Sequence, residues 1–321
     1  MTLPDFSVFQ LFVLILSALL LFLYGLEHFS RELQRLGENR LPRLLGNATR
    51  HRLGGLLLGA LVTAIVQSSS AVTALVVALV DAGTLSFAGS LAVLLGANIG
   101  TTATAWLVSF KLTSIGPFLI VLGGLLTILP FAIRVAGRAI FYFGFIFFSL
   151  DLVAQSLTPL QQSPWLRDAL TLGTTPWIGV LMGAGITLVL QSSSVVSGLA
   201  VVLVHQGVLP PEAAVAIVVG ANAGTTVTAL IASIPMDAFA RRSAQINTFF
   251  NLSGVLLLLP WVTPFARWAL SIGNTPAQAV AVAHLSFNLG LALLFLPFTG
   301  WLGRHWAPKG SPASAPENAL L

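Results

Sequence analysis

The sequence predicts an all-α polytopic membrane protein composed of two inverted repeats, with two re-entrant hairpins, two broken helices and about seven full spans. Of the 321 residues, 56% are hydrophobic and only 8% are charged, whereas a soluble domain has about 25% charged residues. Two polar motifs, QSSS and GANxGTT, each occur twice within apolar sequence. The two copies are separated by the same distance along the chain for both motifs, which indicates an internal duplication.

The duplication extends well beyond the motifs. QSSS occupies Gln67–Ser70 and Gln191–Ser194, 124 residues apart (67 to 191). GANxGTT occupies Gly96–Thr102 and Gly220–Thr226 at the same offset. Residues 55–109 align with 179–233 without a gap, and about half of the paired positions are identical. A repeat of this length is far longer than a solenoid unit and matches half of a membrane transport protein.

The first repeat, residues 1–134, is expected to contain a helix, a hairpin over 53–82, a broken helix over 85–110 and a helix over 115–133. A straight helix over 53–82 would measure about 45 Å, but the hydrocarbon core is about 30 Å thick. Its centre is QSSS, and serine favours caps and turns over helix interiors. In 85–110, two glycines flank Asn98, which indicates unwound backbone.

The second repeat, residues 135–262, is expected to follow the same order, with a hairpin over 177–206, a broken helix over 211–234 and a helix over 244–261. Residues 263–305 form an extra C-terminal helix without a counterpart in the duplication. The proline-containing tail 306–321 is expected to be disordered. Each repeat crosses the membrane three times, an odd number, so the two halves should be inverted relative to each other.

The basic residues predict the orientation. With the loop after the first helix in the cytoplasm, twelve of the 15 Lys and Arg lie inside and three, Lys111, Arg167 and Arg267, lie outside, as the positive-inside rule expects. This places the N-terminus outside and the C-terminus in the cytoplasm of a multi-pass protein of the plasma (bacterial inner) membrane. Hairpins that crossed completely would give the same count, so the re-entrant interpretation depends on length and on the polar turns. The basic residues set topology, and no nucleic acid is expected as a partner.

The hairpin tips are predicted to bind an anion. Each QSSS precedes a half-helix whose first N–H groups are free and whose N-terminus carries about half a positive charge. Serine hydroxyls add further donors. Tips that enter from opposite faces would meet near mid-membrane. Two helix ends fall short of neutralising a doubly charged anion, so cations should bind with it.

The breaks in the two long helices are predicted to bind those cations, because freed backbone carbonyl groups are good ligands for hard cations. Uncharged oxygen ligands suit Na⁺ better than Mg²⁺ or Zn²⁺. The absence of cysteine excludes thiolate metal sites, and neither a cofactor nor another metal is expected. The side chains that would add oxygen ligands are Gln67, Thr101 and Thr104 and their repeat counterparts Gln191, Thr225 and Thr228.

The duplicated QSSS hairpins, each followed by GANxGTT, resemble the type II sodium–phosphate cotransporter family, over roughly Phe22–Phe298. The resemblance is to a bacterial-type member without a C-terminal regulatory domain. It implies Na⁺-coupled transport of inorganic phosphate by alternating access around a midplane site, and it implies that the chain is not an enzyme. The expected phosphate-binding residues are Ser68, Ser69, Ser70, Ser192, Ser193, Ser194, Asn98 and Asn222. The expected sodium-binding residues are Gln67, Ser68, Thr101, Thr104, Gln191, Ser192, Thr225 and Thr228.

The sequence departs from the family in one element. A His-x-x-Phe-Asn pattern usually follows the break in each half, but the second half has Asn247–Asn251 with Asn in place of His, and the first half lacks the pattern. The pattern does occur at His284–Asn288 in the last helix. The ratio of Na⁺ to phosphate therefore stays open.

Two other functions stay open. A proton-coupled oxyanion carrier would use Asp81 and His205, which occupy matching positions at the bases of the hairpins. An anion channel would need the same tips without coupling. An enzyme is disfavoured because neither a Gly-x-Ser-x-Gly nor a His-Glu-x-x-His motif is present.

The Gly55/Gly59 and Gly179/Gly183 pairs indicate close packing of the hairpin arms. A carboxylate near a helix end, as at Glu27 and Asp151, is expected to snorkel or pair. A homodimer is left open.

Overall fold

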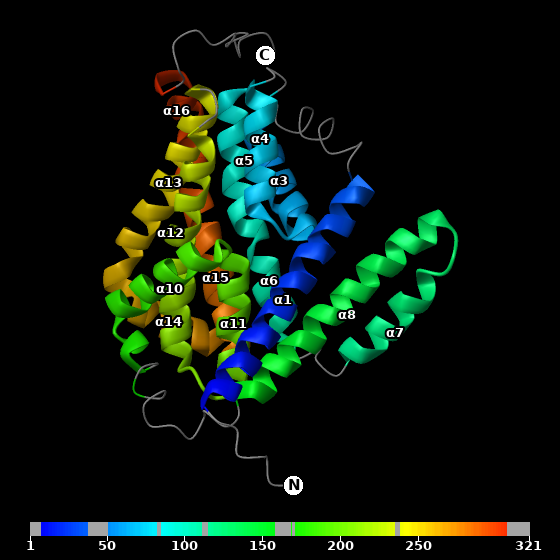
Figure 1. The fold of residues 1–321 in the computed structure, drawn as a ribbon. Helices are drawn as coiled ribbons and strands as arrows, with labels where there is room; N and C mark the ends of the chain where they lie inside the picture. Colours follow the sequence, from blue (N-terminus) through cyan, green and yellow to red (C-terminus); the bar gives the residue numbers. More distant parts are fainter. Residues whose placement is uncertain are drawn as a thin grey trace.

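The computed structural model describes residues 8–37, 51–81, 85–110, 115–157, 168, 171–234 and 238–306, and these ranges are helical and contain no strand. This confirms the predicted all-α class (Figure 1). The helices of the first repeat are α1 (Val8–Gly37), α3 (Arg52–Val66), α4 (Ser69–Asp81), α5 (Phe87–Gly100), α6 (Thr102–Ser109) and α7 (Gly116–Leu126). The remaining helices are α8 (Phe131–Leu157), η3 (Leu172–Thr174), α10 (Pro176–Leu190), α11 (Ser193–His205), α12 (Pro211–Ser233), α13 (Ala238–Leu258), η4 (Leu259–Trp261), α14 (Val262–Ile272), α15 (Pro276–Phe295), η5 (Leu296–Phe298) and α16 (Thr299–His305).

Among the described residues, five helical stretches are long and apolar enough to cross a bilayer, against the seven or so expected. They are Phe9–Leu33, Phe87–Ser109, Ile133–Ser156, Arg241–Ile272 and Pro276–His305. The expected span over 115–133 is wrong, because α7 has 11 residues and measures only about 16 Å. The extra C-terminal helix is present as the continuous stretch Pro276–His305, which α15, η5 and α16 form. It does not extend over the whole of 263–305, because α14 ends at Ile272 and a break precedes the N-cap Thr275 of α15.

Both predicted hairpins are present as pairs of half-length helices. Helix α3 ends at Gln67 and α10 ends at Gln191, where the backbone turns into the left-handed region with φ of 56° and 55°. No other non-glycine residue in the described ranges has a positive φ. The pair α3/α4 lies in the upper half of the bundle in Figure 1, and α10/α11 lies in the lower half. The two polar turns therefore approach each other from opposite ends.

The predicted broken helix over 85–110 is present as two helices, α5 and α6, which are separated at Thr101 within the first GANxGTT motif, although Thr101 keeps right-handed helical angles and the backbone is not unwound. The predicted break in the helix over 211–234 is wrong, because α12 runs unbroken through the second motif. The glycines serve close packing instead. A Cβ atom on Gly96 would collide with the carbonyl oxygen of Leu56 on α3, and one on Gly220 would collide with that of Val180 on α10. Glycine permits both positive φ angles and the close approach of a neighbouring backbone, and at Gly96 and Gly220 it serves the close approach.

The same interface explains the glycines of the hairpin arms. A Cβ atom on Gly59 would collide with the carbonyl oxygen of Val93 on α5, and one on Gly183 would collide with that of Ile217 on α12. The predicted close packing is confirmed at these two glycines, but the partner is the long helix that follows rather than the other arm of the hairpin. Helix α3 lies backbone to backbone against α5, and α10 lies in the same way against α12.

Helix α15 lies between the two repeats, although it has no counterpart in either. It contacts α5 and α6 of the first repeat and α11 and α12 of the second. Its buried face is rich in alanine, including Ala279, Ala281 and Ala283, so neighbouring backbones approach closely. His284 and Asn288 are also fully buried on this helix. The extra helix thereby joins the two halves into one core.

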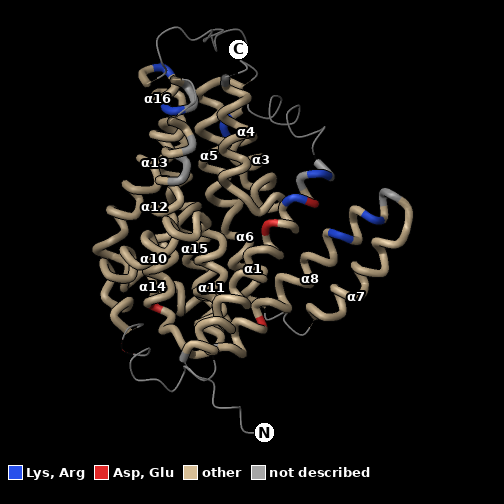
Figure 2. Tube along the Cα trace, viewed as in Figure 1, with Lys and Arg blue, Asp and Glu red and all other residues tan. Residues whose placement is uncertain are grey.

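Helices α1, α7 and α8 form the periphery. Helix α8 packs between α1 and α7, and α7 is outermost in Figure 1. Large apolar side chains of α7, such as Phe118 and Leu125, are exposed, as expected for surface that faces lipid. The Arg residues visible in Figure 2 lie in the upper part of the view, on the side of the bundle that carries α16. Arg40, Arg43, Arg50, Lys111, Arg167, Lys309 and the tail from 307 lie outside the described residues.

The glycine interface gives a first test. We expect Gly220→Ala to destabilise the protein by about 1–3 kcal/mol, the usual cost of overpacking, because the new methyl group would meet backbone that cannot yield. Gly185→Ala is the matched control on the adjoining helix α10, where a Cβ atom would meet nothing within 4 Å. Thermal unfolding in detergent measures the difference. Equal midpoints for the two variants would contradict the close packing of α10 on α12.

Candidate functional site

A pocket lies where the two hairpin tips meet. It has a volume of about 240 Å³. Both QSSS segments line it, so the structure brings together the two motifs that the sequence places 124 residues apart. Its lining residues are Leu23, Leu26, Glu27, Ser30, Gln67, Ser68, Ser69, Ser70, Gln191, Ser192, Ser193, Ser194, Val195 and Thr225.

Each tip is formed by two successive helix caps. The N–H group of Gln67 donates to the carbonyl of Thr63 at 2.7 Å, and that of Gln191 donates to Thr187 at 2.7 Å, which ends the first half-helix. The hydroxyl of Ser192 then accepts from the N–H of Val195 at 3.4 Å and starts the second half-helix. Serine is favoured at this position because its oxygen satisfies a free backbone donor.

Ser68 has the corresponding role in the first repeat, where its hydroxyl accepts from the N–H of Ala71 at 3.2 Å. The N-terminal turns of α4 and α11 consequently border the pocket with Ser69, Ser70, Ser193 and Ser194. A helix N-terminus carries about half a positive charge and unpaired N–H groups. Two such ends and six serine residues at one pocket make a suitable environment for a small oxyanion.

The two glutamines of the tips differ in their surroundings. Gln67 is buried, and its Oε1 accepts from the hydroxyl of Thr104 on α6 at 2.5 Å while its Nε2 donates to the carbonyl of Ala64 at 2.5 Å. Gln191 is exposed. The side chain of Thr228, the counterpart of Thr104, lies outside the described part of the structure. The duplicated motif is thus held differently in the two repeats.

Several residues predicted for the site lie outside the pocket. Asn98 donates to Oδ1 of Asn247 at 3.3 Å, and Asn222 donates to the carbonyl of Val218 on its own helix at 2.9 Å. Thr101 donates to the carbonyl of Asn98 at 2.6 Å. The carbonyl groups expected to be free at 96–100 and 220–224 belong to helical backbone instead. Of the predicted cation ligands, Gln67, Ser68, Gln191, Ser192 and Thr225 line the pocket.

Helix α1 contributes a wall of the pocket that the sequence did not assign to it. Ser30 is buried there and donates to the carbonyl of Val66 at 2.5 Å, so it satisfies one of the acceptors left free where α3 ends. Glu27 also lines the pocket. A carboxylate within an apolar helix was the available signal, because such residues in membrane segments usually have a function.

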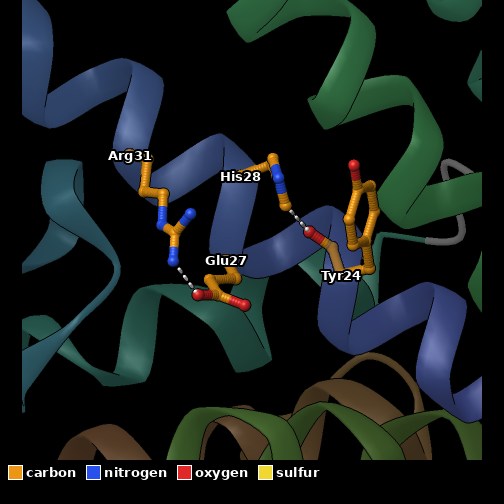
Figure 3. A network of polar contacts seen from close by, with 4 residues as sticks. All are labelled: Tyr24, Glu27, His28 and Arg31. Carbon is orange, nitrogen blue, oxygen red and sulfur yellow. Dashed lines mark hydrogen bonds and ion pairs between the residues drawn. The ribbon is translucent and has the colours of Figure 1, made fainter.

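Glu27 is the one charged residue among those that line the pocket. Its Oε1 accepts from Nη2 of Arg31 at 2.5 Å, and both side chains are more than half exposed. The expected pairing of Glu27 near a helix end is therefore confirmed. The ring of His28 packs against Tyr24 of the same helix (Figure 3), with a centroid distance of 3.8 Å, and against Tyr142 of α8, at 5.1 Å. The pair Glu27–Arg31 faces away from α8.

Comparison with known proteins identifies one family. The family model described as Na⁺/Pi-cotransporter matches residues 21–155 and 157–264. The "Uncharacterized protein YqeW" of Bacillus subtilis is 31% identical over 286 residues, which cover 88% of this chain and 93% of that protein. The "Putative inorganic phosphate export protein YjbB" of Escherichia coli K12 is 29% identical over 293 residues. That match covers 90% of this chain but 54% of YjbB, so the chain spans about half the length of that relative.

A mammalian relative matches over a shorter region. The "Sodium-dependent phosphate transport protein 2C" of Mus musculus is 39% identical over 133 residues, which cover 39% of this chain and 22% of the mouse protein. No solved structure matches the chain.

The bond between the first tip and α6 gives a second test. We expect Thr104→Val to destabilise the protein by about 1–3 kcal/mol, because it leaves the buried Oε1 of Gln67 without its donor. Thr102→Val is the matched control, since the buried Thr102 hydroxyl donates only to the carbonyl of Ile99 in the preceding turn. Thermal unfolding in detergent without substrate measures both variants. A smaller loss for Thr104→Val than for Thr102→Val would show that this bond does not hold the tip.

Proposed function

We propose that this chain, which belongs to the Na⁺/Pi-cotransporter family, moves inorganic phosphate across a membrane in symport with Na⁺ through the pocket between its two QSSS tips. The observation that carries the proposal is the convergence of both tips on one pocket. The mouse relative is named as a sodium-dependent phosphate transport protein and the E. coli relative as a putative phosphate exporter. Both names give phosphate, and the first adds sodium dependence while the second adds export.

The tips supply the donors that a tetrahedral oxyanion requires. Hydroxyl groups of Ser69, Ser70, Ser193 and Ser194 would donate to phosphate oxygens, together with the N–H groups of the first turns of α4 and α11. The two helix ends contribute about one positive charge in total, whereas phosphate at neutral pH carries between one and two negative charges. Binding of phosphate is therefore favoured when cations bind in the same pocket. This electrostatic deficit is the physical basis of the proposed coupling.

Side-chain oxygens at the pocket are the proposed cation ligands. Gln191, Ser192 and Thr225 present uncharged oxygen atoms next to the second tip, a donor set that suits Na⁺. Their counterparts in the first repeat are Gln67, Ser68 and Thr101, with Thr104 and Thr228 completing the two sets. A cation in the first set would replace the donor that Thr104 gives to Gln67. Asn98 and Asn222 lie outside the pocket in this conformation, and we propose that they position α5 and α12.

Alternating access would act on the two hairpins. The first arm of each hairpin, α3 or α10, packs backbone to backbone on the long helix that follows the hairpin. Helix α3 would therefore move with α5, and α10 would move with α12. Movement of one such unit relative to the other would open the pocket to one side or the other. We propose that the chain crosses a plasma membrane several times. The positive-inside rule supports an orientation with the N-terminus outside and the C-terminus in the cytoplasm.

Phosphate export is the second candidate, and the name of the E. coli relative favours it. Symport with Na⁺ under an inward Na⁺ gradient moves phosphate inward, so export needs exchange for an entering ion, coupling to another ion, or no coupling. His205 is a candidate for proton coupling, and its Nε2 lies 3.1 Å from the carbonyl oxygen of Ser109 at the end of α6. The side chain of Asp81, the other candidate, lies outside the described part of the structure.

Reconstituted transport separates these functions. We expect proteoliposomes to accumulate labelled phosphate when an inward Na⁺ gradient is imposed, and to lose accumulation when choline or K⁺ replaces Na⁺. A pH gradient that sustains accumulation without Na⁺ would refute the symport and support the proton-coupled carrier. Flux in both directions without accumulation would support a channel.

The cation ligands have their own test. We expect Gln191→Ala to weaken the apparent Na⁺ affinity of transport by roughly 1–3 kcal/mol, because a ligand oxygen at the pocket is lost. We expect Gln67→Ala to act in the same direction. Gln206→Ala is the matched control, since Gln206 ends α11 at the base of the same hairpin and does not line the pocket. Wild-type Na⁺ affinity in both tip variants would refute the assignment.

A further inference from the structure

A carboxylate in a pocket proposed for an anion is unexpected, because two negative charges at one site repel each other. Glu27 is such a carboxylate, and its partner is the guanidinium of Arg31. Charged residues within membrane segments are costly to bury and usually serve the function. The pair therefore requires an explanation beyond the packing of α1.

We propose that Arg31 binds the phosphate directly, and that Glu27 holds the guanidinium at the pocket when no anion is bound. This proposal rests on the proposed function of the pocket as a phosphate site. On binding, the guanidinium exchanges the Glu27 carboxylate for the phosphate oxygens. The carboxylate that it leaves then faces the pocket as a ligand for a cation.

The geometry of α1 places the pair for this exchange. Glu27, Ser30 and Arg31 are spaced i, i+3 and i+4, so they share one face of the helix. Glu27 and Ser30 line the pocket, and Ser30 fixes this turn of α1 to the first tip through the carbonyl of Val66. Arg31 is thus one hydrogen bond away from a pocket-lining oxygen. Its side chain is 59% exposed, so packing does not prevent it from turning.

A separate contact keeps α1 in place while Arg31 moves. The ring of His28 packs against Tyr142 of α8. A nitrogen of the same ring lies 2.9 Å from the carbonyl oxygen of Tyr24 (Figure 3). This contact does not involve Glu27 or Arg31. The anion can therefore recruit the guanidinium without a change in how α1 packs on α8.

The charges then balance. The two helix ends contribute about one positive charge, and Arg31 raises this to about two, which matches a phosphate dianion. A guanidinium also presents paired donors that fit phosphate oxygens in a bidentate arrangement. The released Glu27 carboxylate restores a negative charge at the pocket, so a cation is favoured only after the anion has engaged Arg31.

The second repeat supports a specific role for this pair. At the offset of 124 residues, Asp151 corresponds to Glu27 and Gln155 corresponds to Arg31. Gln155 donates to Asp151 at 2.6 Å, so the same i, i+4 bond is present without the positive charge. Neither residue lines the pocket. The duplication has kept the bond in both halves and has an arginine only where the helix borders the pocket.

Equilibrium binding of labelled inorganic phosphate to the purified full chain at fixed Na⁺ tests the proposal. We expect Arg31→Gln to weaken phosphate binding by about tenfold or more, as for a lost charge-assisted contact. Arg31→Lys should bind phosphate with an intermediate affinity, because an ammonium lacks the paired donors. Arg35→Gln is the matched control one turn further along α1. Its partner Glu32 keeps Arg138 at 3.2 Å, and Arg35 and Glu32 do not line the pocket, so binding should stay within about twofold of wild type.

Glu27→Gln separates binding from a purely structural pair. It breaks the same ion pair, but it leaves Arg31 available, so we expect phosphate binding at least as tight as wild type and a weaker apparent Na⁺ affinity. Equal losses of phosphate affinity in Glu27→Gln and Arg31→Gln would overturn the proposal, as would equal affinities in Arg31→Gln and Arg35→Gln. Failure of the wild-type chain to bind phosphate would instead refute the function on which this proposal rests.

Discussion

Close backbone packing between the first arm of each hairpin and the long helix that follows the hairpin is the constraint on which the structure depends. A half-length helix cannot cross the membrane, so its end must be held at mid-depth by neighbours rather than by the two interfaces. Glycines at 59, 96, 183 and 220 allow α3 to lie on α5 and α10 to lie on α12 without intervening side chains. This packing holds each tip within the bundle, and the two tips line one pocket.

Ending two helices within the bundle leaves polar backbone groups that hydrocarbon cannot satisfy. The chain satisfies part of them locally, because Gln67 and Gln191 turn into the left-handed region and Ser68 and Ser192 cap the next helices. It satisfies another part with α1, since Ser30 donates to Val66. The donors that remain at the N-termini of α4 and α11 border a pocket rather than lipid. The cost of the interrupted helices is thereby turned into a binding environment for an anion.

The sequence predicted the hairpins because their signals are local. A segment too long for one crossing with QSSS at its centre has few other solutions, and the turns at Gln67 and Gln191 lie where the motif begins. The unwound backbone expected at Gly96 and Gly220 is not present, because glycine has two uses and only the partner backbone decides between them. Glu27 and Ser30 were not assigned to the site because their proximity to the first tip is a tertiary contact between α1 and α3. No pattern within either segment reveals that contact.

The same motif therefore lies in two different environments. Gln67 is hydrogen-bonded to Thr104 and buried, whereas Gln191 is exposed. Helix α1 brings the carboxylate of Glu27, which is paired with Arg31, to the pocket, and the matching turn of α8 brings no charged residue there. Helix α15 has no counterpart at all, yet it contacts both repeats. A pocket with two identical halves would offer a ligand two equivalent orientations and would open equally to both sides. The duplicated tips supply equivalent donors, and the unequal surroundings make the two halves of the pocket chemically different.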